Sequence, residues 1–113
     1  MTDEPTGILN PGTIDAMTVA DDGFVELHVE QTADWDRSDQ LLLLTQEKLY
    51  NYLAFVADGE LARAHPDAGR RWRVVLDLRD EPDQRTAELF RRAGEEFRRL
   101  GGTVVKRRMP ADR

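Results

Sequence analysis

Three side chains that could act together are spaced two positions apart: Glu26, His28 and Glu30. In a β-strand, side chains at this spacing project from one face at intervals of roughly 7 Å. Carboxylate and imidazole groups so arranged could capture a metal ion weakly. No further ligand is identifiable, and a solvated strand face explains the same triplet. We therefore predict no metal centre here and treat the three residues as candidates for an interaction surface.

Four carboxylates near the end of a second apolar stretch could hold Mg²⁺: Asp77, Asp80, Glu81 and Asp83. They would lie at the carboxyl end of a strand, where α/β proteins place their ligands. Asp80 and Asp83 are also suited to begin the helix that follows, as a cap and a first-turn anion. That role is enough to explain both residues, so we predict no metal and no cofactor at this edge.

The two histidines give little indication of catalysis. His65 precedes Pro66 in a predicted loop, without an assigned carboxylate or nucleophile, and such a histidine is usually an ordinary surface residue. A small metal-dependent or acid–base enzyme built on Asp77, Asp80 and His28 or His65 remains the alternative to a non-catalytic domain.

The charge of the chain is uneven. The formal net charge is −6, and residues 1–69 hold 14 of the 22 acidic residues but 3 of the 16 basic ones. A basic cluster near the C-terminal end could bind nucleic acid, but no aromatic residues interleave with it and the chain is net negative. We expect internal ion pairing and no nucleic-acid partner. The cluster consists of Arg98, Arg99, Lys106, Arg107 and Arg108.

The composition limits both chemistry and location. Cysteine is absent among the 113 residues, which excludes disulfides, thiolate nucleophiles and zinc–thiolate sites. No stretch reaches the length of a membrane span, and residues 1–12 lack the basic and apolar regions of a signal peptide. We expect a cytoplasmic protein without a membrane partner.

The elements that position these residues are organised around one helix, predicted over residues 38–61. Its apolar side chains form two adjoining stripes, so it should contact other elements on more than one side. Ser38, with Asp36 as second choice, is suited to cap its start, and Gly59 to end it. Four polar residues interrupt the apolar arc, which a solvated edge or a polar contact would explain equally well: Gln46, Glu47, Lys48 and Asn51.

Alternation of apolar and polar residues predicts strands over residues 13–20, 24–31, 71–79 and 103–109, with a hairpin turn at residues 21–23. A second helix should begin at residues 80–83, with Pro82 in its first turn, and end at Gly101. The order ββαβαβ predicts an α+β fold, in which a mixed β-sheet carries both helices on one face. We expect a flexible tail over residues 1–12, a single domain over residues 13–109 and a tail over residues 110–113.

Several features resemble a family of small bacterial domains of unknown function. They are Ile14-Asp15, the Asp22-Gly23 turn, Trp35, Pro66 and a helix with Lys48, Tyr52, Leu53 and Phe55 at the family's spacing. The resemblance covers about residues 13–108 and implies a fold but no reaction.

The order of elements and the Val-Val-Leu-Asp-Leu strand at residues 74–78 are also similar to the STAS domains, which are anti-sigma-factor antagonists. Those domains carry a phosphorylatable serine after this strand. Here residues 80–86 replace that loop, and Thr86 is the nearby hydroxyl. The likeness implies a regulatory, partner-binding module as an alternative function.

The sequence favours a non-catalytic protein–protein interaction domain that binds an unidentified partner or a second copy of itself as a homodimer. The face of the sheet that the helices leave open is the expected interaction surface. It would carry Glu26, His28, Glu30, Arg73 and Asp77.

Overall fold

The computed structural model places its elements in the order β1-β2-α1-α2-β3-α3-β4. The structure describes residues 12, 14–31, 39–69 and 71–109; most of both predicted tails and the caps at Ser38 and Asp36 lie outside these ranges. The α+β prediction is confirmed, with one short helix more than the predicted order. The strands are β1 (Ala16–Val19), β2 (Val25–Gln31), β3 (Trp72–Leu78) and β4 (Thr103–Arg108), and the helices are α1 (Asp39–Ala57), α2 (Glu60–Ala64) and α3 (Gln84–Arg99).

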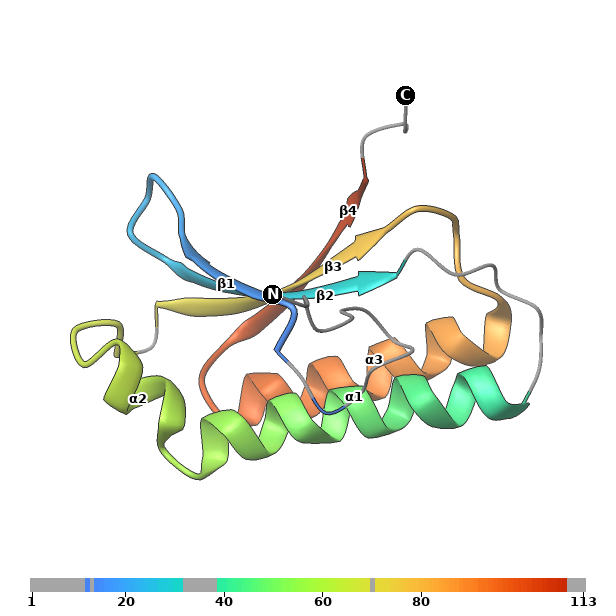
Figure 1. Cartoon of the computed structure of the whole chain (residues 1–113), viewed down its shortest axis with the longest axis horizontal. Coiled ribbons are helices and arrows are strands. Elements are labelled where there is room, and N and C mark those ends of the chain that lie inside the picture. Colours follow the sequence, from blue (N-terminus) through green and yellow to red (C-terminus); the bar gives the residue numbers. More distant parts are fainter. Residues whose placement is uncertain (1–11, 13, 32–38, 70, 110–113) are drawn as a thin grey trace, which may run out of the picture.

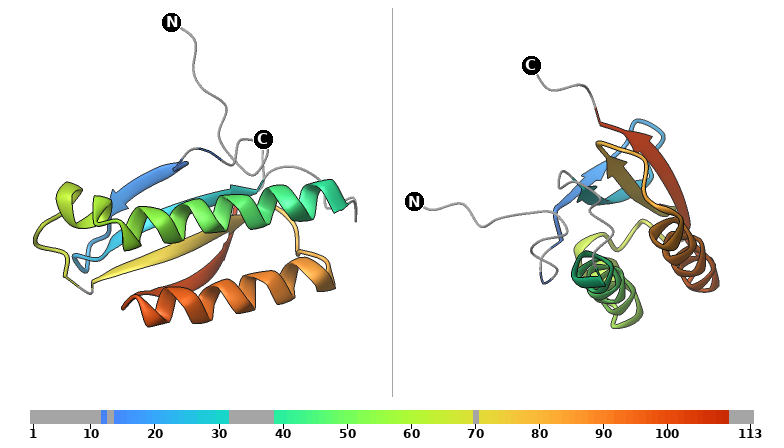
Figure 2. Two further views of the ribbon diagram at one scale, coloured as in Figure 1. Left: turned by 90° about the horizontal axis from the view of Figure 1, so that it is seen from below. Right: turned by 90° about the vertical axis from the view of Figure 1, so that its right-hand side faces the viewer.

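The four strands form one mixed sheet in the order β1-β2-β3-β4. β1 runs antiparallel to β2, whereas β2, β3 and β4 are parallel to one another. The long helices α1 and α3 both lie against the same face (Figure 1), and the views in Figure 2 show them side by side beneath the sheet. Neither helix covers the opposite face, which we call the open face.

The core lies between this sheet and the two long helices. Leu27, Val29 and Val74 point into it and are fully buried, as the alternation along β2 and β3 predicts. Trp72 meets the ring of Phe97 from α3 edge to face, with ring centroids 6.2 Å apart. The buried stripe of α3 therefore packs on the parallel part of the sheet.

The four consecutive leucines of α1 point in different directions, as their spacing predicts. Leu41 is buried, Leu42 and Leu44 are half-buried, and Leu43 is 62% exposed. α1 packs on the sheet core and contacts both α2 and α3. The central helix thus has neighbours on more than one side.

The predicted end of the central helix at Gly59 is confirmed, although the stretch predicted over residues 38–61 is divided there into two helices. α1 ends at Ala57, and Gly59 has a φ of 85°, a left-handed conformation that only glycine adopts readily. The chain then forms α2, from which Leu61 enters the core. The loop predicted after residue 61 is therefore partly helical.

Of the two explanations left open for Lys48, the structure supports the polar contact, because Lys48 belongs to a charged pair in the interior. The Nζ of Lys48 lies 2.5 Å from Oδ1 of Asp15, and both side chains are fully buried. Asp15 also accepts the Glu30 N–H, and its own N–H donates to the Tyr52 hydroxyl, which in turn donates to the His28 carbonyl. We call Asp15, Lys48 and Tyr52 the buried polar cluster. It ties α1 to the first two strands, and burial raises the pKa of Tyr52 well above its ordinary value.

The start of α3 also differs from its prediction. Asp83 is the N-cap and its side chain accepts the Thr86 N–H at 2.8 Å. Pro82 therefore precedes the helix instead of lying in its first turn. Because the cap bond fixes the helix start at Asp83, Asp80 is left to pair with Arg79 at the end of β3.

Candidate functional site

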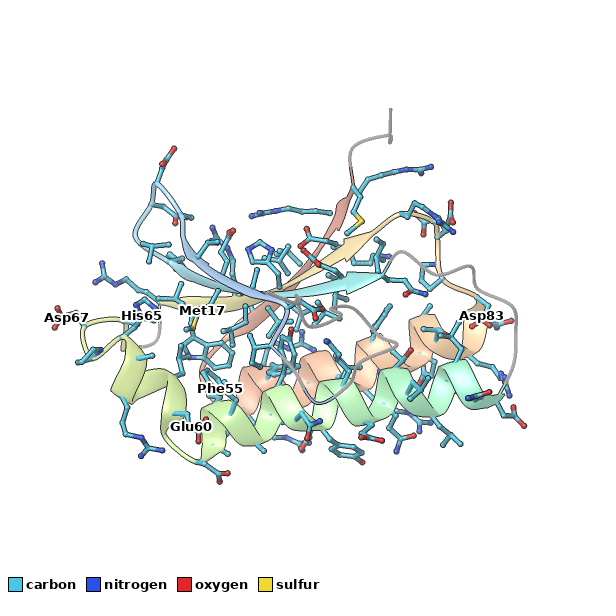
Figure 3. The ribbon with its side chains drawn as sticks, viewed as in Figure 1. Met17, Phe55, Glu60, His65, Asp67 and Asp83 are labelled. Carbon is cyan, nitrogen blue, oxygen red and sulfur yellow. The ribbon has the colours of Figure 1, made fainter. Side chains whose placement is uncertain are left out.

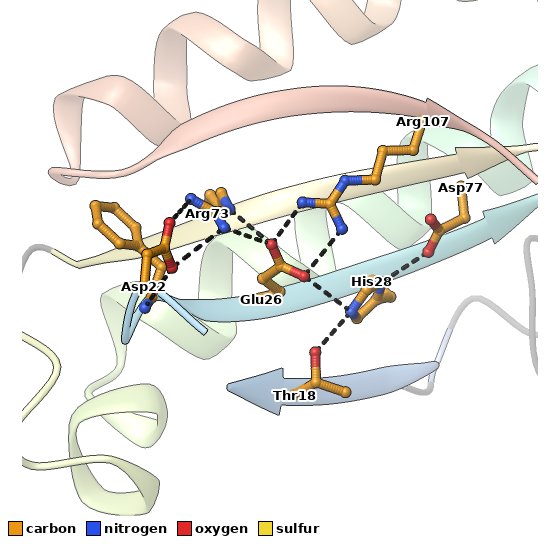
Figure 4. Close-up of polar contacts among 8 residues, drawn as sticks. Thr18, Asp22, Glu26, His28, Arg73, Asp77 and Arg107 are labelled. Atoms are coloured by element: carbon orange, nitrogen blue, oxygen red, sulfur yellow. Dashed lines mark hydrogen bonds and ion pairs between the residues drawn. The ribbon is translucent and has the colours of Figure 1, made fainter. Parts of the chain in front are cut away.

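The open face carries a group of linked polar side chains, which we call the sheet-face cluster (Figure 4). β2 and β3 pair in parallel register, with Glu26 opposite Arg73 and Glu30 opposite Asp77. The side chains of these residues point away from the helices because their neighbours in each strand point into the core. The cluster consists of Thr18, Asp22, Glu26, His28, Arg73, Asp77 and Arg107.

Glu26 is the centre of the cluster and is only 4% exposed. Its carboxylate accepts two hydrogen bonds from Arg107, at 2.7 and 3.0 Å, and one from Arg73 Nε at 2.8 Å. The Arg107 hydrogen bonds, followed by those of Arg73, hold the pKa of Glu26 below its ordinary value despite burial. Glu26 therefore keeps its negative charge, and its two partners are fixed in place.

Arg73 extends the cluster to the hairpin turn. Its guanidinium donates to Asp22 at 3.1 Å and lies over the ring of Phe24, 4.8 Å from the ring centroid. The backbone N–H of Phe24 donates to Asp22 and, together with Arg73, lowers the pKa of that carboxyl. Hydrogen bonds to Glu26, the largest contribution, raise the pKa of Arg73.

His28 lies between carboxylates and a hydroxyl. Its Nδ1 is 2.7 Å from Oδ2 of Asp77, and its Nε2 is 2.9 Å from Oγ1 of Thr18 and 3.7 Å from Oε1 of Glu26. With Asp77 ionised, Nδ1–H donates to it and Nε2 is left to accept the Thr18 O–H. This is the arrangement of a general base that a carboxylate orients beside a hydroxyl.

The structure thus joins four of the five residues predicted for this surface in one network. Glu30 lies on the same face, beside Asp77 in the register. Its backbone N–H donates to Asp15 at 2.8 Å.

The other predicted candidates lie elsewhere. His65 and Asp67 lie beyond α2, at the end of the molecule opposite Asp83 (Figure 3). Asp80 and Glu81 line a hollow of about 230 Å³ together with three cationic residues of β4, an environment that suits an anion better than a metal ion. Thr86, the hydroxyl nearest to the position of the phosphorylatable serine in STAS domains, is 2% exposed and therefore out of reach of a kinase in the folded chain.

Among the members of the sheet-face cluster, Arg107 lines a hollow, the one that it shares with Asp80 and Glu81. Within the described ranges, no three His, Asp or Glu side chains converge in a way that could hold a metal ion. Five hollows on the described surface lie along α1, α3 and β4, and their linings do not include His28 or Asp77. For the same part of the chain, no helix is both long enough and apolar enough to cross a membrane.

Sequence reasoning missed three members of the cluster: Thr18, Asp22 and Arg107. Thr18 is opposite Glu26 in the hairpin register, which the predicted turn at residues 21–23 nearly fixes. Arg107 contacts Glu26, which lies 81 positions earlier in the sequence. Predicting this contact would have required knowledge of the strand order. The alternation of β4 alone would have placed Arg107 on the face opposite Val104.

Comparison with known proteins gives one match. A family model described as "Family of unknown function (DUF6572)" matches residues 6–106. The comparisons with curated proteins and with solved structures found no match.

Proposed function

The chain belongs to a family of unknown function, DUF6572, and from its geometry we propose that it is a non-catalytic protein-interaction domain that binds through the open face of its sheet. The observation that supports this proposal is the sheet-face cluster, a charged and mutually hydrogen-bonded surface that neither α1 nor α3 covers.

The cluster is already ordered in the free chain. The side chains of Arg73, His28 and Asp77 are only 17%, 15% and 20% exposed, and each has a hydrogen-bond partner. Binding to a fixed surface avoids the entropy cost of ordering side chains at the interface. Beneath them Val75 is fully buried although it points to the open face, so the cluster forms a continuous layer.

The charge of this face indicates the kind of partner. Four carboxylates lie on it or at its border, against the guanidinium groups of Arg73 and Arg107, so these six groups together are net negative while His28 is neutral. A partner protein with a basic patch would be complementary, and complementary charge accelerates and directs association. The carboxylates belong to Asp22, Glu26, Glu30 and Asp77.

Site-specific cross-linking tests this proposal. A photoreactive residue replaces Thr103, which is exposed and on the open face, and in a control replaces Glu47 on the outer side of α1. We expect the first position to cross-link a basic protein in cells of the source organism and the second not to. With the purified partner, Glu30→Lys should weaken binding at least tenfold, whereas Glu47→Lys should change it less than twofold. Equal effects of the two substitutions would reject the open face as the contact surface.

One observation favours a second function. The distances from Asp77 to His28 and from His28 to Thr18 suit acid–base activation of a hydroxyl. If Thr18 is a nucleophile, incubation with p-nitrophenyl acetate should transfer the acetyl group to its oxygen, release p-nitrophenolate and leave the hydroxyl proton on His28. Mass spectrometry should then locate the adduct at Thr18 and find none in the His28→Asn variant. An unmodified Thr18 after prolonged incubation would leave the interaction domain as the function.

A further inference from the structure

β4 forms one edge of the sheet, and its outer side has no strand partner within the described residues. The Met109 N–H donates to the Leu78 carbonyl at 2.9 Å, so the odd-numbered residues of this strand turn their backbone groups towards β3. Val104, Lys106 and Arg108 therefore turn their amides and carbonyls outwards. Such an edge is a template to which another strand can add.

A groove of about 230 Å³ lies beside this edge, between β4 and α3. Ala87, Phe90, Gly94 and Val104 give it an apolar lining. Its volume is below the roughly 300 Å³ at which pockets for small ligands begin, so it suits one or two side chains. The alternate side chains of a strand added to β4 would project on this side of the sheet.

Gly94 lines the groove close to both Val104 and Arg98. A Cβ at this position would lie 3.8 Å from Cγ2 of Val104, in ordinary contact. The same Cβ would lie 3.5 Å from a guanidinium nitrogen of Arg98. Arg98 therefore lies over the apolar lining at the C-terminal part of α3.

Three cationic side chains line the groove: Arg91, Arg98 and Lys106. Lys106 lines both this groove and the neighbouring hollow that reaches Arg108. For Arg98, Lys106 and Arg108, no carboxylate lies within ion-pair distance in the part of the chain that the structure describes. On the outer surface of α3, by contrast, Arg92 pairs with Glu88.

A second copy of this chain would not suit the edge. Pairing of β4 with the β4 of another copy would bring Lys106, Arg107 and Arg108 of both chains into one two-stranded segment. Like charges on neighbouring strands destabilise such a pair, and cations on an edge strand are a known means of preventing self-pairing. A strand with acidic side chains meets no such obstacle.

We propose that the outer edge of β4 binds an extended segment of a partner protein, which adds to the sheet as a fifth strand. On the side that faces α3, this segment places apolar side chains in the groove and acidic side chains opposite Arg98 and Lys106. The interaction is independent of the sheet-face cluster, because it uses the strand edge and the helix-facing side of β4.

A synthetic peptide of nine residues tests the proposal. Threonine occupies its odd positions, and its even positions are glutamate, valine, valine and glutamate. We expect the fluorescently labelled peptide to bind the full chain in an anisotropy titration. N-methylation of the threonines removes the N–H donors of the odd positions and should weaken binding at least tenfold. Lysine in place of glutamate should also weaken binding at least tenfold.

Hydrogen exchange locates the binding. Saturating peptide should slow amide exchange at Val104, Lys106 and Arg108 at least tenfold, and leave Val105 and Arg107 unchanged because these already bond to β3. Protection elsewhere in the chain without protection of the three outward amides would refute strand addition. Absence of binding at 1 mM peptide would refute the proposal as a whole.

Substitutions distinguish binding at the β4 edge from binding at the open face. Arg98→Gln and Lys106→Gln should each weaken peptide binding about two- to fivefold, as expected for exposed ion pairs, while Arg92→Gln, the matched control on α3, should have no effect. Glu30→Lys, which tests the open face, should leave peptide binding unchanged.

Two further outcomes would overturn the proposal. One is a 20-base-pair DNA duplex that binds more tightly than the peptide and responds to the same substitutions. The other is a dimer in sedimentation whose formation protects the three outward amides, which would assign the edge to a second copy.

Discussion

Replacing Lys48 with methionine should destabilise the fold more than replacing an exposed lysine. The ammonium group is fully buried, 2.5 Å from an equally buried Asp15 carboxylate and 5.9 Å from the centre of the Tyr52 ring. Lys48→Met keeps the length of the side chain but leaves Asp15 without its cation. Removing one partner of a buried ion pair costs about 3–5 kcal/mol. For a domain of this size, that loss corresponds to a decrease in Tm of roughly 12–20 °C.

Urea unfolding followed by circular dichroism, with a double-mutant cycle, measures this effect. Lys106→Met is the matched control, because Lys106 is exposed, and it should change stability by no more than about 0.5 kcal/mol. Asp15→Asn should cost as much as Lys48→Met, since it leaves the ammonium group unpaired. The double variant should lose only about 1–3 kcal/mol, because it buries no unpaired charge. A loss below about 1 kcal/mol in Lys48→Met, or strictly additive losses in the cycle, would refute this reasoning.

Two further substitutions test other parts of the structure. Glu26→Gln should cost about 1–2 kcal/mol, because it weakens charge-assisted hydrogen bonds. Arg107 holds the folded-state pKa of Glu26 below its ordinary 4.5. The stabilisation by ionised Glu26 is therefore present above pH 4.5 and is lost as the pH falls through the lowered pKa. The unfolding curves of the unsubstituted chain and of Glu26→Gln should converge in acid. Gly102→Ala would place a Cβ 2.5 Å from the Trp72 ring and should cost about 1–3 kcal/mol. Gly12→Ala, for which no atom of the described residues lies within 4 Å of the added Cβ, should be nearly neutral in the same urea unfolding assay.

Short-range patterns in the sequence were enough to predict most of the fold. The alternation of Val25, Leu27 and Val29 identifies the inner face of β2, and it assigns Glu26 and His28 to the opposite face whatever the strand order is. Helical spacing and the acidic start likewise identify α3 to within a few residues. These predictions succeed because the pattern of apolar and polar residues within a strand or an amphipathic helix shows which of its faces is buried.

Contacts between distant segments could not be predicted in this way. Lys48 lies in the polar part of α1, and nothing within the helix reveals that Asp15, 33 positions earlier, is buried opposite it. The link from Arg107 to Glu26 has the same origin. The short helix α2 was missed because Gly59 is equally suited to end a helix and to separate two.

The register of the sheet has a consequence for how the chain folds. Thr18 and His28 are 10 positions apart, whereas Glu26 and Arg73 are 47 apart. The hairpin can therefore close in roughly microseconds, but parallel pairing must wait until the intervening chain has been ordered. Docking of α1 on the hairpin through Asp15 can come before that step. During this interval the edge of β2 that will pair with β3 has no partner. Mutational φ-values that are high in β2 and α1 but low in β4 would support this order of assembly.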